Sequence, residues 1–542
     1  MIVKKNLRLV KGFTSFKILI FLSNFLFSDQ IQFVPFDWGY QFGYSKNKGM
    51  IIWGEDWRSK NLLFDGTWSI FVPMYGEDIM EDFLKGNHQK IILDSSQVNS
   101  NIAYDQGDYG LDNFSVGINY FEKNRQIDLQ GFKRSYFGSR NQYYLNTSQP
   151  QQQSYTFSYK SKINKGQTGL SIGHFNTLAG FPDTSTNGIF DNRITSLNYF
   201  YQKRLGSSSF EFFMDHFLQR YKAVHSLSFY NKSRYLNRSI YKAQLVSSIN
   251  KVPVLFGLSR NDRTTFLDSN VNNEWYEFYS ILQWHALKLS SIITQYKDQL
   301  FFDYSIIFEK KFKTFEIFAL NKTLSLPIHP YYQHNLQDFQ NNNFFRKVVN
   351  HASIEWSGLK NEISLAISFA KDNQKLEQLS SSLQNQYSNM KLTYSRNIFS
   401  NLDVLLSYNT TGTKNYYSGG IGNEIGLGLQ SQCFLFKNFM KLEAGSDIKY
   451  YSKRVNYSMI NPIVMVPLIV EENQGELPPV TLINGNVRVT VSSVIFKFTW
   501  INISEIFLSS IGSNENNFFR LHPIMPIMGR QINYSIHWAY QD

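Results

Sequence analysis

Apolar and polar residues alternate one by one along most of this sequence, in segments of about ten residues. In residues 300–308 every even position is apolar, and residues 362–369 repeat the pattern on the odd positions. Successive side chains of a β-strand point to opposite faces, so each segment would have one apolar and one polar face. The pattern predicts strands, rather than helices, over most of the chain.

The length of these segments distinguishes between two all-β folds. A soluble antiparallel sandwich alternates in the same way, but its strands average about five or six residues. Segments of about ten residues match strands that cross a bilayer at a tilt. Aromatic residues make up 16% of the chain and often stand at segment ends, where an interfacial girdle would lie. We therefore expect an all-β fold, a transmembrane antiparallel β-barrel.

Short and long connections between the segments alternate. The short ones fall at 123–126, 164–167, 205–207, 250–252, 357–360 and 396–400, and the long ones at 137–153, 176–193, 221–238, 323–344, 371–386 and 451–475. Outer-membrane barrels combine tight periplasmic turns with long external loops in this way. The strands can alternate in direction along the whole chain only if one external connection, near 297–299, is short as well.

The strand number follows from this alternation. From Phe114 to the C-terminus we find roughly 21 segments, and an even-stranded barrel then needs at least one more strand from residues 30–110. The Asn484-Gly485 pair is a strong tight-turn motif in this count. The expected barrel has about 22 strands, within a range of roughly 18 to 24.

The N-terminus predicts export. Residues 1–17 are basic, and Ile18 to Phe27 form a short apolar core. This is the order of a secretory signal peptide. The alternative is an N-terminal membrane anchor, but a ten-residue helix spans only about 15 Å, roughly half of the hydrocarbon core, which favours a cleaved signal. We predict a signal peptide at 1–28 and the barrel at 111–542, in the cell outer membrane of a Gram-negative-type bacterium. Residues 29–110 would supply the first strand or strands, or a lumen-facing irregular element.

Charge and cysteine content exclude some functions. The formal net charge is +12, but five cations lie in residues 1–28, and the remaining 49 basic and 42 acidic residues give +7 without a basic run. Cys433 is the only cysteine, which excludes an intramolecular disulfide framework and a multi-cysteine metal site. We expect no nucleic-acid partner and no cofactor.

Three motifs that resemble chemical sites have plainer structural interpretations. Residues 169–173 match Gly-x-Ser-x-Gly, but a nucleophile elbow needs a strand, a turn and a helix, whereas these residues alternate as one strand. The glycines at 420–428 miss the dinucleotide-binding spacing and suit a crowded barrel interior. His329 and His334 fall in an expected external loop, where a ligand or metal site is the alternative to a solvated loop. We expect no enzyme, no catalytic residue and no metal site.

The polar strand faces supply the candidate site residues. In a water-filled barrel, inward polar side chains and infolded loops select solutes by size and charge. The pore-lining candidates are Asp303, Ser305, Glu309, Glu362, Ser364, Asp403, Ser407, Lys497, Asn533 and His537.

The C-terminal residues resemble a known family. A segment at 496–502 is followed by a loop that ends in Pro526-Ile527-Met528-Gly529-Arg530, and then by an alternating strand at 531–540. This resembles the closing hairpin of TonB-dependent-receptor-type barrels and of their plugless porin-like relatives in Bacteroidetes-like bacteria. Two further residues follow the last aromatic one, Tyr540, which departs from the family's pattern. Residues before the barrel lack a recognisable plug motif, so the resemblance implies a plugless relative.

The leading hypothesis is an outer-membrane porin-like channel or solute-uptake barrel. The alternatives are a barrel that docks a partner lipoprotein or surface complex, and a barrel enzyme, a lipase or protease. Expected partners are outer-membrane lipid, small solutes and the barrel-assembly machinery, with a surface lipoprotein in the docking alternative. A lumen of about 22 strands is wide enough to hold a plug. We therefore expect residues 45–110, or the loops at 323–344 and 451–480, to fold into it.

Overall fold

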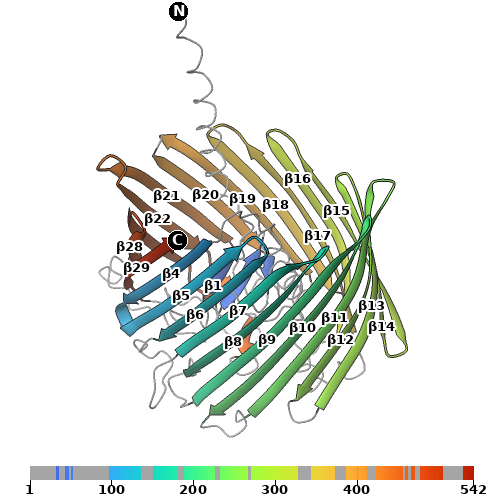
Figure 1. Ribbon diagram of the computed structural model, residues 1–542. Helices are drawn as coiled ribbons and strands as arrows, with labels where there is room; N and C mark the ends of the chain where they lie inside the picture. Colours follow the sequence, from blue (N-terminus) through green and yellow to red (C-terminus); the bar gives the residue numbers. More distant parts are fainter. Residues whose placement is uncertain are drawn as a thin grey trace, which may run out of the picture.

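The computed structural model is a closed wall of β-strands (Figure 1). It describes residues 32–35, 43–47, 50–52, 97–135, 151–180, 188–225, 232–266, 270–327, 344–372, 386–399, 401–411, 423–455, 458–461, 466–469, 476–504 and 529–541. The wall contains 22 strands, and each is antiparallel to the neighbours with which it pairs. The expected fold class, an antiparallel barrel of about 22 strands, is confirmed.

The strands of the barrel follow one another in chain order. They are β4 (Gln97–Gly107), β5 (Leu111–Glu122), β6 (Arg125–Ser135), β7 (Gln151–Ile163), β8 (Gly166–Gly180), β9 (Gly188–Leu205), β10 (Ser208–His225), β11 (Lys232–Ile249), β12 (Val252–Phe266), β13 (Asn270–Trp284), β14 (Leu287–Tyr296), β15 (Gln299–Lys311), β16 (Phe315–Pro327), β17 (Phe344–Ser357), β18 (Asn361–Asp372), β19 (Gln386–Phe399), β20 (Leu402–Thr411), β21 (Asn423–Leu435), β22 (Met440–Tyr451), β27 (Val480–Val491), β28 (Val494–Ile501) and β29 (Gln531–Gln541). A 3-10 turn, η2 (Asp108–Gly110), joins β4 to β5.

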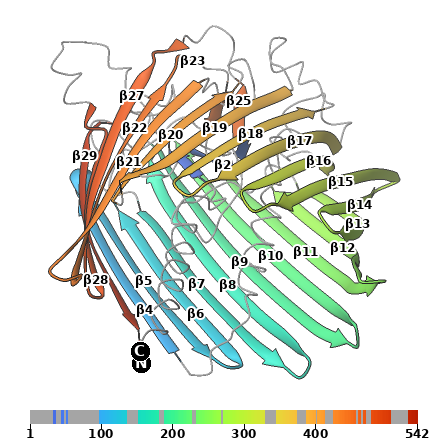
Figure 2. The same ribbon diagram turned by 90° about the horizontal axis from the view of Figure 1, so that it is seen from above.

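The first and last strands close the barrel. Strand β29 pairs with β4 over nine residue positions, from Asn533 opposite Gly107 to Gln541 opposite Asn99. The two strands run side by side in both views (Figures 1 and 2). Strand β4 lies within residues 30–110, where the sequence required one more strand.

Three small sheets accompany the wall. Strands β1 (Gln32–Pro35), β2 (Gly43–Asn47) and β3 (Met50–Ile52) form one of them, and its ribbons fall within the outline of the barrel in both views (Figures 1 and 2). The other two lie between β22 and β27. Strand β23 (Arg454–Val455) pairs with β26 (Glu476–Leu477), and β24 (Ser458–Asn461) with β25 (Val466–Ile469). The predicted signal peptide, 1–28, lies outside the described residues.

The two-residue period of the sequence becomes the two faces of the wall. In β18, Ile363, Leu365, Ile367 and Phe369 are 37–51% exposed on one face, whereas Ala366 and Ser368 between them are buried. A large apolar side chain left exposed in every second position is the arrangement of a membrane-facing wall. Among the described residues, no helix is long and apolar enough to cross a membrane.

Several strands are much longer than the sequence predicts. Strands β9, β10 and β11 each contain 18 residues. Such a strand is about 60 Å long, more than a tilted crossing of a roughly 25 Å apolar band requires. The additional strand length has charged side chains on its outer face, such as Arg193 and Asp191, which form an ion pair at 2.8 Å. Much of the loops expected at 176–193 and 221–238 is therefore strand, because strand pairing continues where the apolar pattern ends.

Most turns lie where the sequence places them. Lys165, Gly206, Asn250 and Lys251 adopt positive φ angles in tight turns, as short hairpins require. On the opposite side, a tight turn at 297–298 joins β14 to β15, which confirms the expected short external link. The turn expected at 396–400 is displaced, because β19 continues to Phe399 through a register shift.

The predicted turn at Asn484-Gly485 is wrong. Both residues lie inside β27, where Asn484 pairs with Asp447 of β22 and Gly485 with Trp500 of β28. The glycine is required by the Trp500 ring, since a Cβ atom at position 485 would lie 2.2 Å from its indole atoms. The Asn-Gly pair resembles a turn motif, but here its glycine allows close packing within a strand.

Candidate functional site: the inner face of the barrel

The outer face of the barrel is apolar and continuous. In β15, Phe302 and Ile306 are 58% and 43% exposed, whereas Asp303 and Ser305 on the other face are only 2% and 7% exposed. Closed barrels and helices are the two structures that satisfy all backbone hydrogen bonds inside a bilayer. The closed wall and its apolar surface therefore agree with the expected location in the outer membrane.

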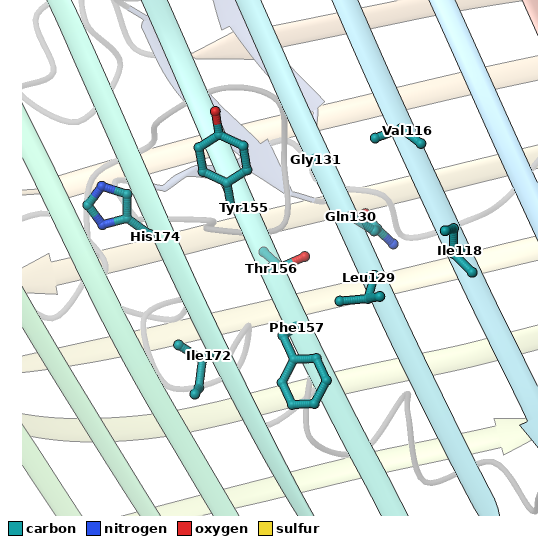
Figure 3. Close-up of a pocket in the computed structure, with 10 residues that line it drawn as sticks. All are labelled: Val116, Ile118, Leu129, Gln130, Gly131, Tyr155, Thr156, Phe157, Ile172 and His174. Carbon is teal, nitrogen blue, oxygen red and sulfur yellow. The ribbon is translucent and has the colours of Figure 1, made fainter.

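A shallow groove interrupts the outer face near Gly131 (Figure 3). The glycine has no side chain, and the gap is bordered by Val116, Tyr155 and Ile172 from the neighbouring strands β5, β7 and β8. These side chains point outward with the rest of the apolar wall. The groove consequently faces lipid and is not part of a solute pathway.

All ten pore-lining candidates lie on the inner face. Cross-strand partners share a face, and Asp403 and Ser407 pair with Gln430 and Gly426. In the same way, His537 pairs with Ala103, opposite to the outward Trp538. The candidates are spread over β15, β18, β20, β28 and β29, so the structure does not gather them into one site. Their role in lining a pore stays a prediction.

Asp303 stabilises the wall itself. Its carboxylate accepts hydrogen bonds from the backbone N–H of Ser325 at 2.7 Å and from the Ser325 hydroxyl at 3.1 Å. Arg346 lies 3.9 Å away. The regular pairing between β15 and β16 ends at Ser305, so Asp303 links the two strands where the ladder stops. A buried charge needs such partners to offset its desolvation.

A hydrogen-bonded ladder crosses the inner face from β8 to β13. Gln167 donates to Gln202 and Gln202 donates to Glu211, both at 2.8 Å, and Gln244 donates to the other carboxylate oxygen of Glu211. Tyr279 donates to Gln244 at 3.0 Å. These hydrogen bonds link side chains of β8, β9, β10, β11 and β13 across the inner face. Sequence alternation gives the face of each residue, but only the register brings them into one row.

Gly257 makes this ladder possible. It stands between Gln244 and Tyr279 in the same row, and a Cβ atom there would lie 2.1 Å from the Tyr279 ring. The tyrosine therefore crosses over β12 to reach Gln244. No sequence motif identifies this contact, because it joins residues of three different strands.

A second polar group lies at the closure of the barrel. The Asp105 carboxylate interacts with His537 Nε2 at 3.2 Å and accepts a hydrogen bond from the Asn113 amide. The Asp108 carboxylate accepts a hydrogen bond from the backbone N–H of Ile532 at 2.9 Å. These contacts join β4, β5 and β29, so His537 has a structural role beside the predicted one.

A third polar group on the inner face has more cationic side chains than carboxylates. On the inner faces of β22 and β27, Glu443 lies 2.6 Å from Lys441 and 3.5 Å from Arg488. Lys497 of β28 stands directly opposite Arg488. Of these residues, sequence analysis selected only Lys497.

The motifs that resembled chemical sites are structural where they are described. Ser171 lies within β8 and its hydroxyl donates to the Ser158 hydroxyl at 3.1 Å, without the turn of a nucleophile elbow. Gly426 faces Ser407 across the inner wall. Among the described residues no group of three or more His, Cys, Asp or Glu side chains could hold a metal ion. His329 and His334 lie outside the described residues.

Comparisons with known proteins identify the fold. No protein-family model matches the sequence, and no curated protein matches it. Among solved structures, the FrpB iron transporter from Neisseria meningitidis is similar with a TM-score of 0.65 at 9% identity, over 95% of each chain. The ferric enterobactin receptor PfeA from Pseudomonas aeruginosa has a TM-score of 0.60 at 8% identity, over 82% of this chain and 80% of its own. The alcaligin receptor FauA from Bordetella pertussis has a TM-score of 0.53 at 10% identity, over 83% and 76%.

These similarities establish the fold. The chain has the 22-stranded barrel of outer-membrane receptors, as the C-terminal resemblance implied. The receptor-like barrel that the sequence predicted is confirmed at this level. What the chain transports or binds does not follow from a likeness at this identity.

Proposed function

We propose that this protein is an outer-membrane barrel that takes up solutes through its lumen. The observation that carries the proposal is the contrast between the two faces, apolar outside and densely polar inside, around a closed wall. A polar interior suits a water-filled route. The similar structures are named as an iron transporter, a ferric enterobactin receptor and an alcaligin outer-membrane receptor, which supports uptake as the general role.

A lumen of this size needs an internal element that narrows it. Barrels of about 16–18 strands leave an aqueous channel, whereas 22-stranded transporters have a plugged lumen. Two segments are suited to narrow the lumen. One contains the residues around β1–β3, whose sheet falls within the outline of the barrel, and the other is the connection that carries β23–β26 (Figure 2). We propose that they set the size limit for solutes.

The test is a conductance measurement on purified protein in planar bilayers. Residues 456–475 are replaced by Asn-Gly, a two-residue turn that can join β23 to β26 because Val455 already pairs with Glu476. Single-channel conductance should rise in this variant. A matched control replaces residues 373–385, the connection between β18 and β19, with the same turn and should change conductance less.

Two outcomes would contradict the proposal. A folded barrel without conductance, in the full chain and in both variants, would argue against solute passage. Stable co-purification of a lipoprotein with such a barrel would instead favour the docking alternative. Unchanged conductance in the 456–475 variant, beside a conducting full chain, would argue against a constriction by that connection.

A further inference from the structure

The inner faces of β22, β27 and β28 carry three cations and one carboxylate. Glu443 is 7% exposed and forms ion pairs with Lys441 and Arg488. Lys497 follows on β28, directly opposite Arg488, and its outward neighbours Phe496 and Phe498 are 47% and 43% exposed. Within the described part of the chain, Lys497 has no carboxylate at ion-pair distance. The group therefore has an excess of two positive charges.

Such an arrangement is unfavourable without a further anion. Residues directly opposite on antiparallel strands have Cβ atoms about 4.5–5.5 Å apart, and like charges in these positions destabilise the sheet. The single carboxylate is shared by Lys441 and Arg488, so it cannot also neutralise Lys497. The Lys441 and Arg488 side chains are 27% and 38% exposed and remain accessible from the lumen.

The next acidic residue on this row does not complete the charge balance. The row continues from Lys497 to Ser535 of β29 and then to Asp105 of β4. Asp105 already interacts with Asn113 and His537 at the barrel closure. Ser535, which is 8% exposed, instead places a hydroxyl beside Lys497.

We propose that Arg488 and Lys497 form an anion site on the lumen wall, which binds a carboxylate or phosphate group of a passing solute. An arginine fork binds such groups through two parallel hydrogen bonds, and a lysine adds a compact point charge. Arg488 lies three residues before the end of β27 and Lys497 three after the start of β28, so the site is near the short-turn end of the barrel. The proposal rests on solute uptake and specifies the charge of the solute.

The test is a calorimetric titration of the purified full-length chain with inorganic phosphate. Lys497→Gln and Arg488→Gln should each weaken phosphate affinity by about tenfold, the value of one charge-assisted hydrogen bond. Lys497→Arg should retain most of the affinity. The matched control is Lys322→Gln on the inner face of β16, seven strands from β27 and eight from β28 along the wall, which should leave affinity unchanged. Heat-modifiable mobility verifies that each barrel is folded.

A variant that should increase phosphate affinity makes the test more specific. Glu443→Gln keeps the shape of the side chain and releases Lys441 and Arg488, so phosphate affinity should rise several-fold. Equal affinities for Lys497→Gln and Lys322→Gln, or no increase in Glu443→Gln, would overturn the site, even if the barrel conducts. Variant-dependent phosphate binding by a barrel that does not conduct would support the site and reject the transport function.

Discussion

An arginine on the outer face of β18 should destabilise the barrel far more than one on the inner face. Leu365 lies four residues after the first residue of β18. In a strand tilted by about 40°, four residues correspond to a rise of about 10 Å along the membrane normal. This is near the centre of a roughly 25 Å apolar band. Its cross-strand partners, Ile354 and Leu392, are 52% and 42% exposed apolar residues. Leu365→Arg would therefore place a charge against lipid.

The expected cost of Leu365→Arg is about 2–4 kcal/mol, or about thirtyfold to several hundredfold in the folding equilibrium. The adjacent Ser364 faces inward between Glu355 and Thr393, so Ser364→Arg adds the same charge beside an acidic residue and should cost less than about 1 kcal/mol. Urea titrations of refolding into lipid vesicles, followed by tryptophan fluorescence, measure both values. Equal losses of stability would refute the assignment of the two faces.

Three further substitutions test local features of the wall. Gly257→Ala should destabilise the barrel by about 1–3 kcal/mol, because the new Cβ meets Tyr279, and the same change in a Tyr279→Ala background should cost less in urea titrations. Asp303→Asn should cost about 1–3 kcal/mol, since it removes the charged acceptor of two hydrogen bonds from Ser325; an unchanged urea midpoint would contradict this. Lys251→Gly should stabilise the barrel by about 1 kcal/mol, as the native φ of 68° disfavours a side chain, and a lower midpoint would exclude strain at that turn.

The two faces of the wall could be predicted from the sequence because the period of a strand is two. Ile363 and Leu365 lie outward and Glu362 and Ser364 inward, as the alternation requires. The approximate strand number was also predictable, since tight turns and long connections alternate in phase. The strand needed before Phe114 is β4, which the sequence located only within a broad range.

Contacts between strands could not be predicted in the same way, because they depend on register. Gly485 forms part of a turn-like pair, yet it lies beneath Trp500, 15 residues away. Asp303 has the pattern of a lumen residue, and its contact with Ser325 depends on where the β15–β16 ladder ends. The cation group at Glu443 likewise requires three strands in their final register.

The central claim, that the inner face lines a solute pathway, is tested most directly by cysteine modification during single-channel recording. Cys433 is first replaced by serine, and then Ser407→Cys on the inner face is compared with Leu406→Cys on the outer face, where Leu406 is 45% exposed. A charged, membrane-impermeant thiol reagent should reduce the conductance of the Ser407→Cys protein stepwise and leave the Leu406→Cys protein unchanged. Open channels that respond at neither position, or only at position 406, would contradict the account.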